Sequence, residues 1–192
     1  TRDRSSFPVL QSRRAFLGTL DASAVILGER GAEAAPGSFV ARPPPGFVPL
    51  SMPGRVVKVS KANTLQPNGL WPTEAAAKAM LERAMAELTG TSDMGKAFGK
   101  FVHKDDKVAI KPNGIAGKNG ATMASNKELV LEIVKGVMAA GVPASNITIY
   151  EQYGKFMAGT RIASKACVLD PAFPAGITAV IHENKDAVMS EI

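Results

Sequence analysis

Lysine, asparagine and glycine residues follow one another in a segment whose composition suits anion binding. Lys111 places a cation directly after an apolar run, and Asn113 and Gly114 tolerate the backbone angles of tight turns. More glycines follow up to position 124, which is typical of a flexible loop that closes over a ligand. We predict that Lys111, Asn113 and Gly114 bind a carboxylate or phosphate. The pattern matches no P-loop or dinucleotide-binding motif, so a solvated polar loop is the alternative.

A carboxylate later in the chain belongs to the same hypothesis. Glu151 follows the apolar run Asn146–Tyr150 and stands near Tyr153 and Lys155. Close to Lys111, it would pair with the lysine, or act as a general base if it were desolvated. We therefore include Glu151 among the ligand-binding residues. The alternative is a salt bridge at the edge of the fold.

Metal and cofactor sites are not indicated by the remaining reactive residues. His103 and His182 lie far apart without neighbouring acidic clusters, and Cys167 stands in an apolar context that predicts a buried thiol. A single cysteine excludes an intrachain disulfide and an iron–sulfur cluster held by this chain's own thiolates. No attachment motif for c-type haem is present. We expect no cofactor bound by this chain.

Strands and helices that would position these residues are predicted from hydrophobic periodicity. The first helix begins after Thr73, a suitable N-cap, and ends at Gly90. Ser125 and Glu128 form a capping-box pattern at the start of another helix, and a short amphipathic piece spans residues 93–101. β-Branched runs predict four strands: Arg55–Val59, Lys107–Lys111, Asn146–Tyr150 and Ile177–Ile181.

The alternation of strands and helices predicts the fold class. We expect an α/β domain with a parallel, doubly wound, Rossmann-like sheet of about four strands and flanking helices. Ligands bind such sheets outside the carboxyl ends of the strands. Lys111 and Glu151 each follow a predicted strand, so this topology brings them to the same edge.

The N-terminus carries an export motif. Arg13 and Arg14 are followed by Phe16 and Leu17, and the run from Ala15 to Gly28 is only mildly apolar and too short to span a membrane. This resembles the twin-arginine export signal of bacteria, in which Arg13, Arg14, Phe16 and Leu17 are the matching residues. We expect a periplasmic or membrane-attached protein. A basic amphipathic helix on a cytoplasmic protein is the alternative.

Three regions are expected along the 192 residues. Residues 1–34 form the signal segment, which ends in the small-x-small cleavage pattern Ala32–Ala34. Residues 35–53 hold six closely spaced prolines and predict an extended arm that lies against a partner or its own domain. Residues 54–192 form the α/β domain, and Asn184–Ile192 reads as a helix without a terminating signal, as in a chain that continues.

The charge of the chain indicates the class of partner. Lysine and arginine exceed the acidic residues by six, and the signal segment accounts for one of these charges. A moderate positive charge favours encounter with acidic partners or an anionic surface. The basic residues are scattered and aromatic residues are few, so nucleic-acid binding is not expected. Membrane contact is expected only through the signal segment, if that segment is uncleaved.

The middle of the chain resembles a known family of prokaryotic proteins. The Ile-Lys-Pro-Asn turn at Ile110–Asn113 and the run Ala140–Ile147 are similar to the "domain of unknown function 362" family over residues 54–160. The resemblance implies an exported α/β protein. Some members carry ferredoxin-like cysteine motifs, which this chain lacks. Many have Asp-Arg after the third strand, where this chain has Glu151-Gln152, so a site built on that pair does not carry over.

Two functions remain open at this point. The first is an accessory subunit of an exported or membrane-bound redox assembly, with protein partners and no chemistry of its own. The second is a periplasmic enzyme or binding protein for a small anionic ligand, which uses the loops after the second and third predicted strands. The first is favoured by the export signal, the apolar proline-rich arm and the lack of an assembled catalytic pattern. Whether the chain is an enzyme is not decided by its sequence.

Overall fold

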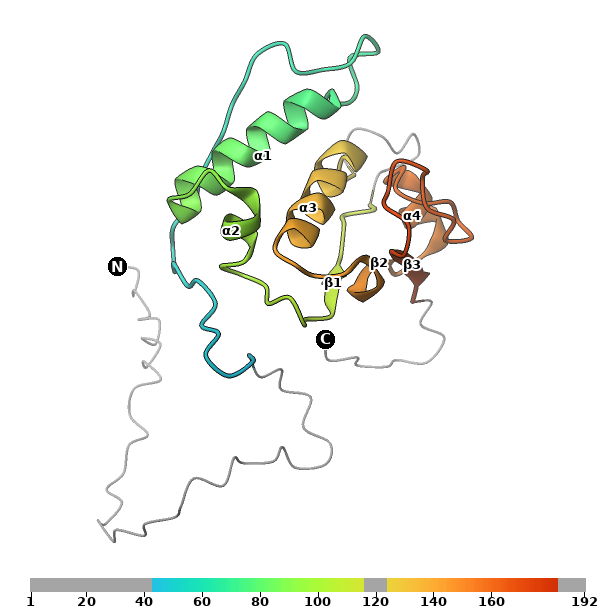
Figure 1. Cartoon of the computed structure of the whole chain (residues 1–192). Coiled ribbons are helices and arrows are strands. Elements are labelled where there is room, and N and C mark those ends of the chain that lie inside the picture. The colour runs from blue at the N-terminus through green and yellow to red at the C-terminus, as the bar shows by residue number, and fades with distance from the viewer. Residues whose placement is uncertain (1–42, 116–123, 183–192) are drawn as a thin grey trace, which may run out of the picture. The chain divides into compact units, whose positions relative to one another are not determined.

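The computed structural model describes residues 43–115 and 124–182, which belong to one unit of the chain, Phe39–Ile192 (Figure 1). The export motif at Arg13 and Arg14, the cleavage pattern, the first part of the proline-rich arm and most of the glycine-rich loop lie outside the described residues. The segment from Asn184 onward lies outside them as well. The predictions made for these parts therefore stay predictions.

The first helix begins and ends as its sequence predicts. Helix α1 spans Glu74–Thr89, and the hydroxyl of Thr73 accepts a hydrogen bond from the backbone of Ala76 as an N-cap. Gly90 closes the helix in the left-handed conformation, with a φ angle of 74°, which glycine adopts without steric cost. Helix α2 follows over Met94–Phe98, and the Asp93 carboxylate caps it through the backbone of Lys96.

Helix α3 begins one residue later than the capping-box pattern predicts. It spans Lys127–Ala139 with Asn126 as its N-cap, so that prediction is wrong. The hydroxyl of Ser125 instead accepts a hydrogen bond from the backbone of Asn113. The carboxylate of Glu128 is bound by an arginine from another part of the chain. Both side chains of the pattern are thus occupied by tertiary contacts.

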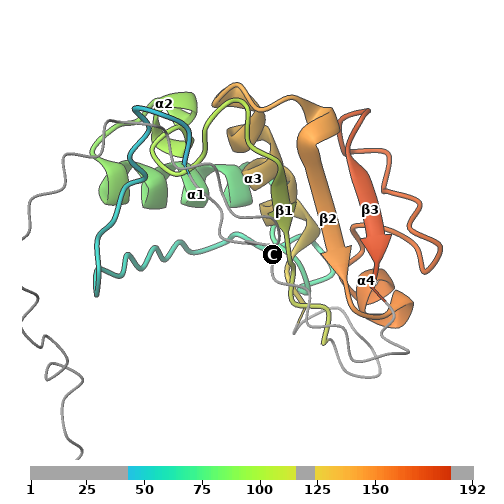
Figure 2. The same ribbon diagram turned by 90° about the horizontal axis from the view of Figure 1, so that it is seen from below.

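Three parallel strands form the sheet (Figure 2). Strand β1 spans Val108–Ile110, β2 spans Ile147–Glu151 and β3 spans Thr178–Ile181. They lie in the order β1-β2-β3, with Val108 beside Ile147 and Tyr150 beside Val180. The short helices η1 (Ala144–Asn146) and α4 (Gly154–Gly159) flank β2. The prediction of an α/β fold with a parallel sheet is confirmed.

The expected fourth strand is absent from the described sheet. Arg55–Val59 is neither helix, strand nor turn, and the side chain of Val56 is 87% exposed. The segment has the β-branched composition of a strand, but it pairs with none of β1–β3. The guanidinium of Arg55 donates to the backbone carbonyl of Glu87 in α1 at 2.6 Å. The predicted count of about four strands is therefore corrected to three.

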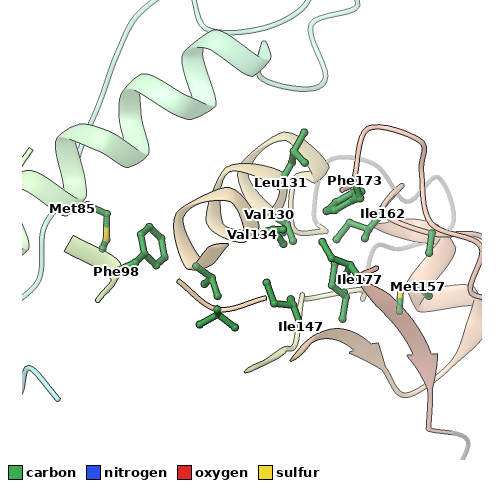
Figure 3. Packing of buried hydrophobic residues seen from close by; sticks show 14 of the residues in the cluster. Met85, Phe98, Val130, Leu131, Val134, Ile147, Met157, Ile162, Phe173 and Ile177 are labelled. Carbon is green, nitrogen blue, oxygen red and sulfur yellow. The ribbon is translucent and has the colours of Figure 1, made fainter. Parts of the chain in front are cut away.

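The hydrophobic core lies between α3 and one face of the sheet. Figure 3 shows Val130 and Val134 of α3 facing the region of Ile147, with Phe98 of α2 beside Met85 of α1 farther along. A Cβ atom on Gly136 would lie 2.2 Å from the Phe98 ring, so only glycine lets that ring pack against α3. Leu131 of α3 also belongs to the core. Further large members come from the chain around β2 and β3: Ile149, Met157, Ile162, Phe173 and Ile177.

Only one face of the sheet carries this core. Ile147, Ile149 and Glu151 of β2 are buried, whereas Thr148 and Tyr150 between them are only half-buried. Both connections, from β1 to β2 and from β2 to β3, are expected to be right-handed and to move in the same direction along the sheet. They therefore pass on the same side. The doubly wound arrangement, with helices on both faces, is not present among the described residues.

The described end of the proline-rich arm contacts its own unit. The backbone N–H of Leu50 donates to the carbonyl of Lys100 at 2.6 Å, and the rings of Phe47 and His103 lie 5.6 Å apart. Val48 is 86% exposed. Residues 43–53 thus lie against the segment that leads into β1. No helix within the described ranges is long and apolar enough to cross a membrane.

Candidate functional site

The predicted site residues meet at the carboxyl edge of the sheet. Lys111 follows β1 and Glu151 ends β2, and these two strands are neighbours. The Lys111 ammonium donates to both carboxylate oxygens of Glu151, with Nζ–Oε distances of 2.7 and 2.9 Å. It also donates to the backbone carbonyl of Pro112 at 3.1 Å. All three of its N–H donors have a partner in this arrangement.

Backbone donors complete the surroundings of the Glu151 carboxylate. The N–H of Gly114 donates to Oε1 at 3.2 Å, and the N–H of Gln152 donates to Oε2 at 2.7 Å. The side chain of Glu151 is only 1% exposed. A buried carboxylate is stable when a cation and hydrogen bonds replace its hydration, and here both are present.

A glycine is required at position 114 by the close approach of the loop to helix α4, which follows β2. A Cβ atom at this position would lie 2.6 Å from the backbone oxygen of Phe156 and 2.7 Å from its Cβ. The absence of a side chain thus lets the loop after β1 reach the carboxylate of Glu151. The sequence predicted that this glycine takes part in ligand binding. In the described fold, the group that the backbone approaches belongs to the protein itself.

Asn113 fixes the two ends of the loop that leaves β1. Its carbonyl accepts from the backbone N–H of Ser125 at 2.8 Å, and its own N–H donates to the Ser125 hydroxyl at 2.8 Å. Its side-chain oxygen accepts from the N–H of Ile115 at 3.1 Å, which closes a local turn. Residues 116–123 between these ends lie outside the described part of the chain.

The geometry favours a structural role for the Lys111–Glu151 pair. A general base must offer a lone pair to the substrate, and the two oxygens of Glu151 already accept four hydrogen bonds. A ligand anion at Lys111 would have to compete with this internal carboxylate. The structure therefore brings Lys111, Gly114 and Glu151 together, with Asn113 beside them. Their role in ligand binding stays a prediction.

A second buried carboxylate was not predicted as part of a site. The guanidinium of Arg161 donates to both oxygens of Glu128 at 2.9 and 2.8 Å, in the two-pronged geometry that arginine favours. The amide of Gln66 donates to Glu128 Oε1 at 3.1 Å and to the carbonyl of Pro72 at 2.8 Å. The Arg161 guanidinium also lies 3.9 Å from the centre of the Trp71 ring, as in a cation–π contact.

The surroundings of Glu128 favour its charged form. Burial by itself would raise the pKa of the carboxyl, but the hydrogen bonds and charge of Arg161, together with the amide of Gln66, hold the pKa below its ordinary value. Glu128 also lies in the first turn of α3, where the helix dipole stabilises a negative charge. This cluster joins the loop before α1, the start of α3 and the segment after α4.

The role of Arg161 could not be predicted from the sequence. It stands alone after a short helix, and its backbone has a φ angle of 62°, which is uncommon for a residue other than glycine. A neighbouring ion pair supports the same region: Lys127 lies 2.8 Å from Asp170. The Lys127 hydrogen bond holds the pKa of Asp170 below its ordinary value, against a smaller opposing effect of burial.

The other candidate groups remain apart from these clusters. Lys155 lies over the rings of Tyr153 and Phe156, 5.7 and 5.3 Å from their centres. His182 reaches Glu151 only through its backbone N–H. Cys167 is partly exposed in a turn, in contrast to the predicted buried thiol. Among residues 43–115 and 124–182, no three histidine, cysteine or acidic side chains gather as metal ligands.

Comparison with known proteins returned no match. No family model, no curated protein and no solved structure matches this chain. The resemblance over residues 54–160 therefore stays a prediction that rests on the quoted motifs, and the role of the site is argued from its geometry alone.

Proposed function

We propose that this chain is a non-catalytic binding subunit that assembles with another protein through the open face of its sheet. The observation that carries the proposal is the exposure of that face. Parallel sheets are normally covered on both sides, because their strands are joined by crossovers that pack against them. Here the side chains of one face are half-buried or exposed within the described structure: Ala109, Thr148, Tyr150, Thr178 and Val180.

The chemistry of the open face suits a protein surface. It is uncharged at its centre, where the hydroxyls of Thr148 and Thr178 hydrogen-bond to each other at 2.9 Å. Val180 is 43% exposed beside Tyr150. Lys107 is exposed at the β1 end of the face, so an acidic margin on the partner would be complementary. A helix of the partner is the element that usually covers such a face.

The site at the carboxyl edge supports a binding role more than a catalytic one. Lys111 and Glu151 satisfy each other, and the backbone of the loop completes their hydrogen bonds. The association with an exported redox assembly belongs to the same proposal. It rests on the Arg13-Arg14 export motif and on the family resemblance, and no described residue adds to it.

The experiment compares two exposed valines. The full chain is expressed in its native host with Val180→Arg on the open face or with Val168→Arg, a control in a turn where Val168 is 68% exposed. Complexes are isolated under native conditions, and their mass is measured by light scattering. We expect Val180→Arg to release the chain from its complex, and Val168→Arg to leave the complex intact. Melting of the isolated chain should be unchanged in both.

A photo-crosslinking residue at Thr178 sharpens the result. Thr178 is exposed on the open face, so a crosslink there should capture one discrete partner. A wild-type chain that runs alone, or a complex that survives Val180→Arg as well as it survives Val168→Arg, would remove the basis of the proposal.

A further inference from the structure

The segment Arg55–Ser60 has the composition of a strand but none of its pairing. Val57 and Val59 are half-buried, whereas Val56 and Lys58 between them are exposed, which is the alternation of a strand with one packed face. Valine also favours the pleated conformation. Within the described ranges, no hydrogen bond joins the backbone of Val56–Ser60 to another segment. An extended segment with free N–H and C=O groups is a template for another strand.

The segment borders an open cleft beside helix α1. The cleft has a volume of about 550 Å³, and its far wall is formed by Arg83 and Glu87 of α1. The guanidinium of Arg55 donates to the Glu87 carbonyl and holds one end of the segment against the helix. The cleft thus leaves space beside this segment. Arg55 is held against α1, whereas the backbone groups of Val56–Ser60 form no hydrogen bond with another described segment.

The charges around this cleft are predominantly positive. Arg55, Lys58 and Arg83 line it, and the only carboxylate in the lining, that of Glu87, is ion-paired with Arg83. Arg55 and Lys58 therefore face the cleft region without a carboxylate partner among the described residues. Two copies of this segment would bring like charges together, which disfavours pairing between them.

We propose that Arg55–Ser60 binds an extended, acidic strand of a partner protein by backbone pairing. The partner strand would add to the segment as in β-augmentation, where main-chain hydrogen bonds supply affinity and alternate side chains supply specificity. Carboxylates at every second position would lie on the face of Lys58, and apolar residues would lie on the face of Val57 and Val59. This site lies on a different surface from the open sheet face and is independent of the proposed function.

Hydrogen exchange of the full chain tests the proposal directly. The probe is a blocked synthetic peptide of about nine residues in which valine and glutamate alternate, and the matched control peptide alternates valine and lysine. We expect the amides of Val56–Ser60 to exchange rapidly in the free chain, and to slow by about tenfold or more with the acidic peptide only. Lys58→Glu should weaken binding about tenfold, whereas Lys61→Glu, outside the cleft lining, should change it little.

Each other result contradicts the proposal in a recognisable way. Slow exchange of these amides before the peptide is added would mean that another part of this chain occupies the segment. Protection that rises with protein concentration alone would assign the surface to a second copy. Equal protection by both peptides, or none by either, would exclude an acidic partner strand. Repeating the experiment with Val180→Arg separates this site from the open sheet face, because that variant should bind the acidic peptide normally.

Discussion

Two of the buried carboxylates, those of Glu151 and Glu128, are neutralised in different ways. Glu151 lies at the end of β2 and accepts hydrogen bonds from one lysine and from two backbone N–H groups. Glu128 lies in the first turn of α3 and depends on two side chains from distant segments, Arg161 and Gln66. The Glu151 site is therefore built mainly by strands that are already neighbours. The Glu128 site exists only when three separate segments have come together.

The difference predicts which site is more easily broken. Backbone donors stay in place when a side chain is replaced, so Glu151 keeps two partners without its lysine. Glu128 would keep the amide of Gln66 and its own backbone N–H, but no cation, if its arginine were removed. A buried charge that loses its cation costs more than the intact pair contributes, because its hydration is not restored.

The largest effect is expected from Arg161→Met. This change leaves the Glu128 carboxylate buried without its cation and removes the contact with the Trp71 ring. We expect the free energy of unfolding to fall by about 3–5 kcal/mol, measured by urea denaturation. The double variant Glu128→Met, Arg161→Met should recover much of this loss, because it leaves no unpaired charge. A loss below about 1 kcal/mol in the single variant would show that the pair is solvated.

A smaller effect is expected from Lys111→Met. The Lys111 side chain is 45% exposed, and both backbone donors to Glu151 remain, so the free energy of unfolding should fall by about 1–2 kcal/mol. Lys165→Met, at an exposed position, is the control and should be close to neutral. If Lys111→Met cost as much as Arg161→Met, the backbone donors would not be the reason for the difference between the two sites.

Lys111→Met also tests whether Lys111 binds an anion. A phosphate bound at Lys111 would stabilise the folded chain and raise its melting temperature in proportion to the logarithm of its concentration. Since the ammonium is occupied by Glu151, we expect phosphate to shift the melting of the wild-type chain and of Lys111→Met equally. A shift confined to the wild-type chain would assign a ligand to Lys111 after all.

The stability of the folded chain should depend on the ionisation of Glu128 at acid pH. Its pKa is lowered in the folded chain, so the unfolded chain binds more protons between this pKa and the ordinary value of 4.5. The stability that comes from this group is present above pH 4.5 and is lost as the pH falls through the folded pKa. We expect the wild-type chain to lose stability in that window more steeply than Glu128→Gln, by at most about 1.4 kcal/mol per pH unit.

Comparing the wild-type chain with Glu128→Gln removes the contribution of the other titrating groups. Asp170 also has a lowered pKa, but it titrates in both proteins and cancels in the difference. Urea denaturation at a series of pH values gives the two slopes. Parallel slopes would mean that Glu128 is protonated at the same pH in the folded and unfolded chains.

The smallest effect is expected from Gln66→Ala. This change removes the amide that joins Glu128 to the carbonyl of Pro72, and leaves the Arg161 pair in place. We expect a loss of about 1 kcal/mol in the free energy of unfolding. Gln152→Ala, whose amide reaches only the exposed hydroxyl of Tyr153, is the matched control and should be near neutral. A loss as large as that of Arg161→Met would make Gln66 the main partner of Glu128.

Elements with local signals were predicted well from the sequence. Thr73 and Gly90 bound helix α1, because capping depends on residues within one turn of the helix end. The three strands of the sheet lie where β-branched runs predict them. Their parallel order places Lys111 beside Glu151, which the topology of α/β sheets had indicated.

Predictions failed where a local pattern competed with a distant partner. The capping box at Ser125 and Glu128 is correct in spacing, but Asn113 and Arg161 bind these side chains instead. The valines of Arg55–Val59 favour a strand, but a strand needs a neighbour, and none of β1–β3 pairs with it. Residue type and spacing carry no information about which partner is within reach.

The sequence by itself determined the positions of the helix ends, the alternation of strands and helices, and the edge of the sheet at which charged residues gather. These depend on capping, periodicity and the direction of crossovers, which act over short stretches of chain. Only the tertiary structure decided that Glu151 is saturated by Lys111 and backbone donors, that Arg161 holds Glu128, and that the described residues leave one face of the sheet open. Burial and hydrogen-bond partners depend on segments that are distant in sequence, and residue types alone do not encode which of those segments meet.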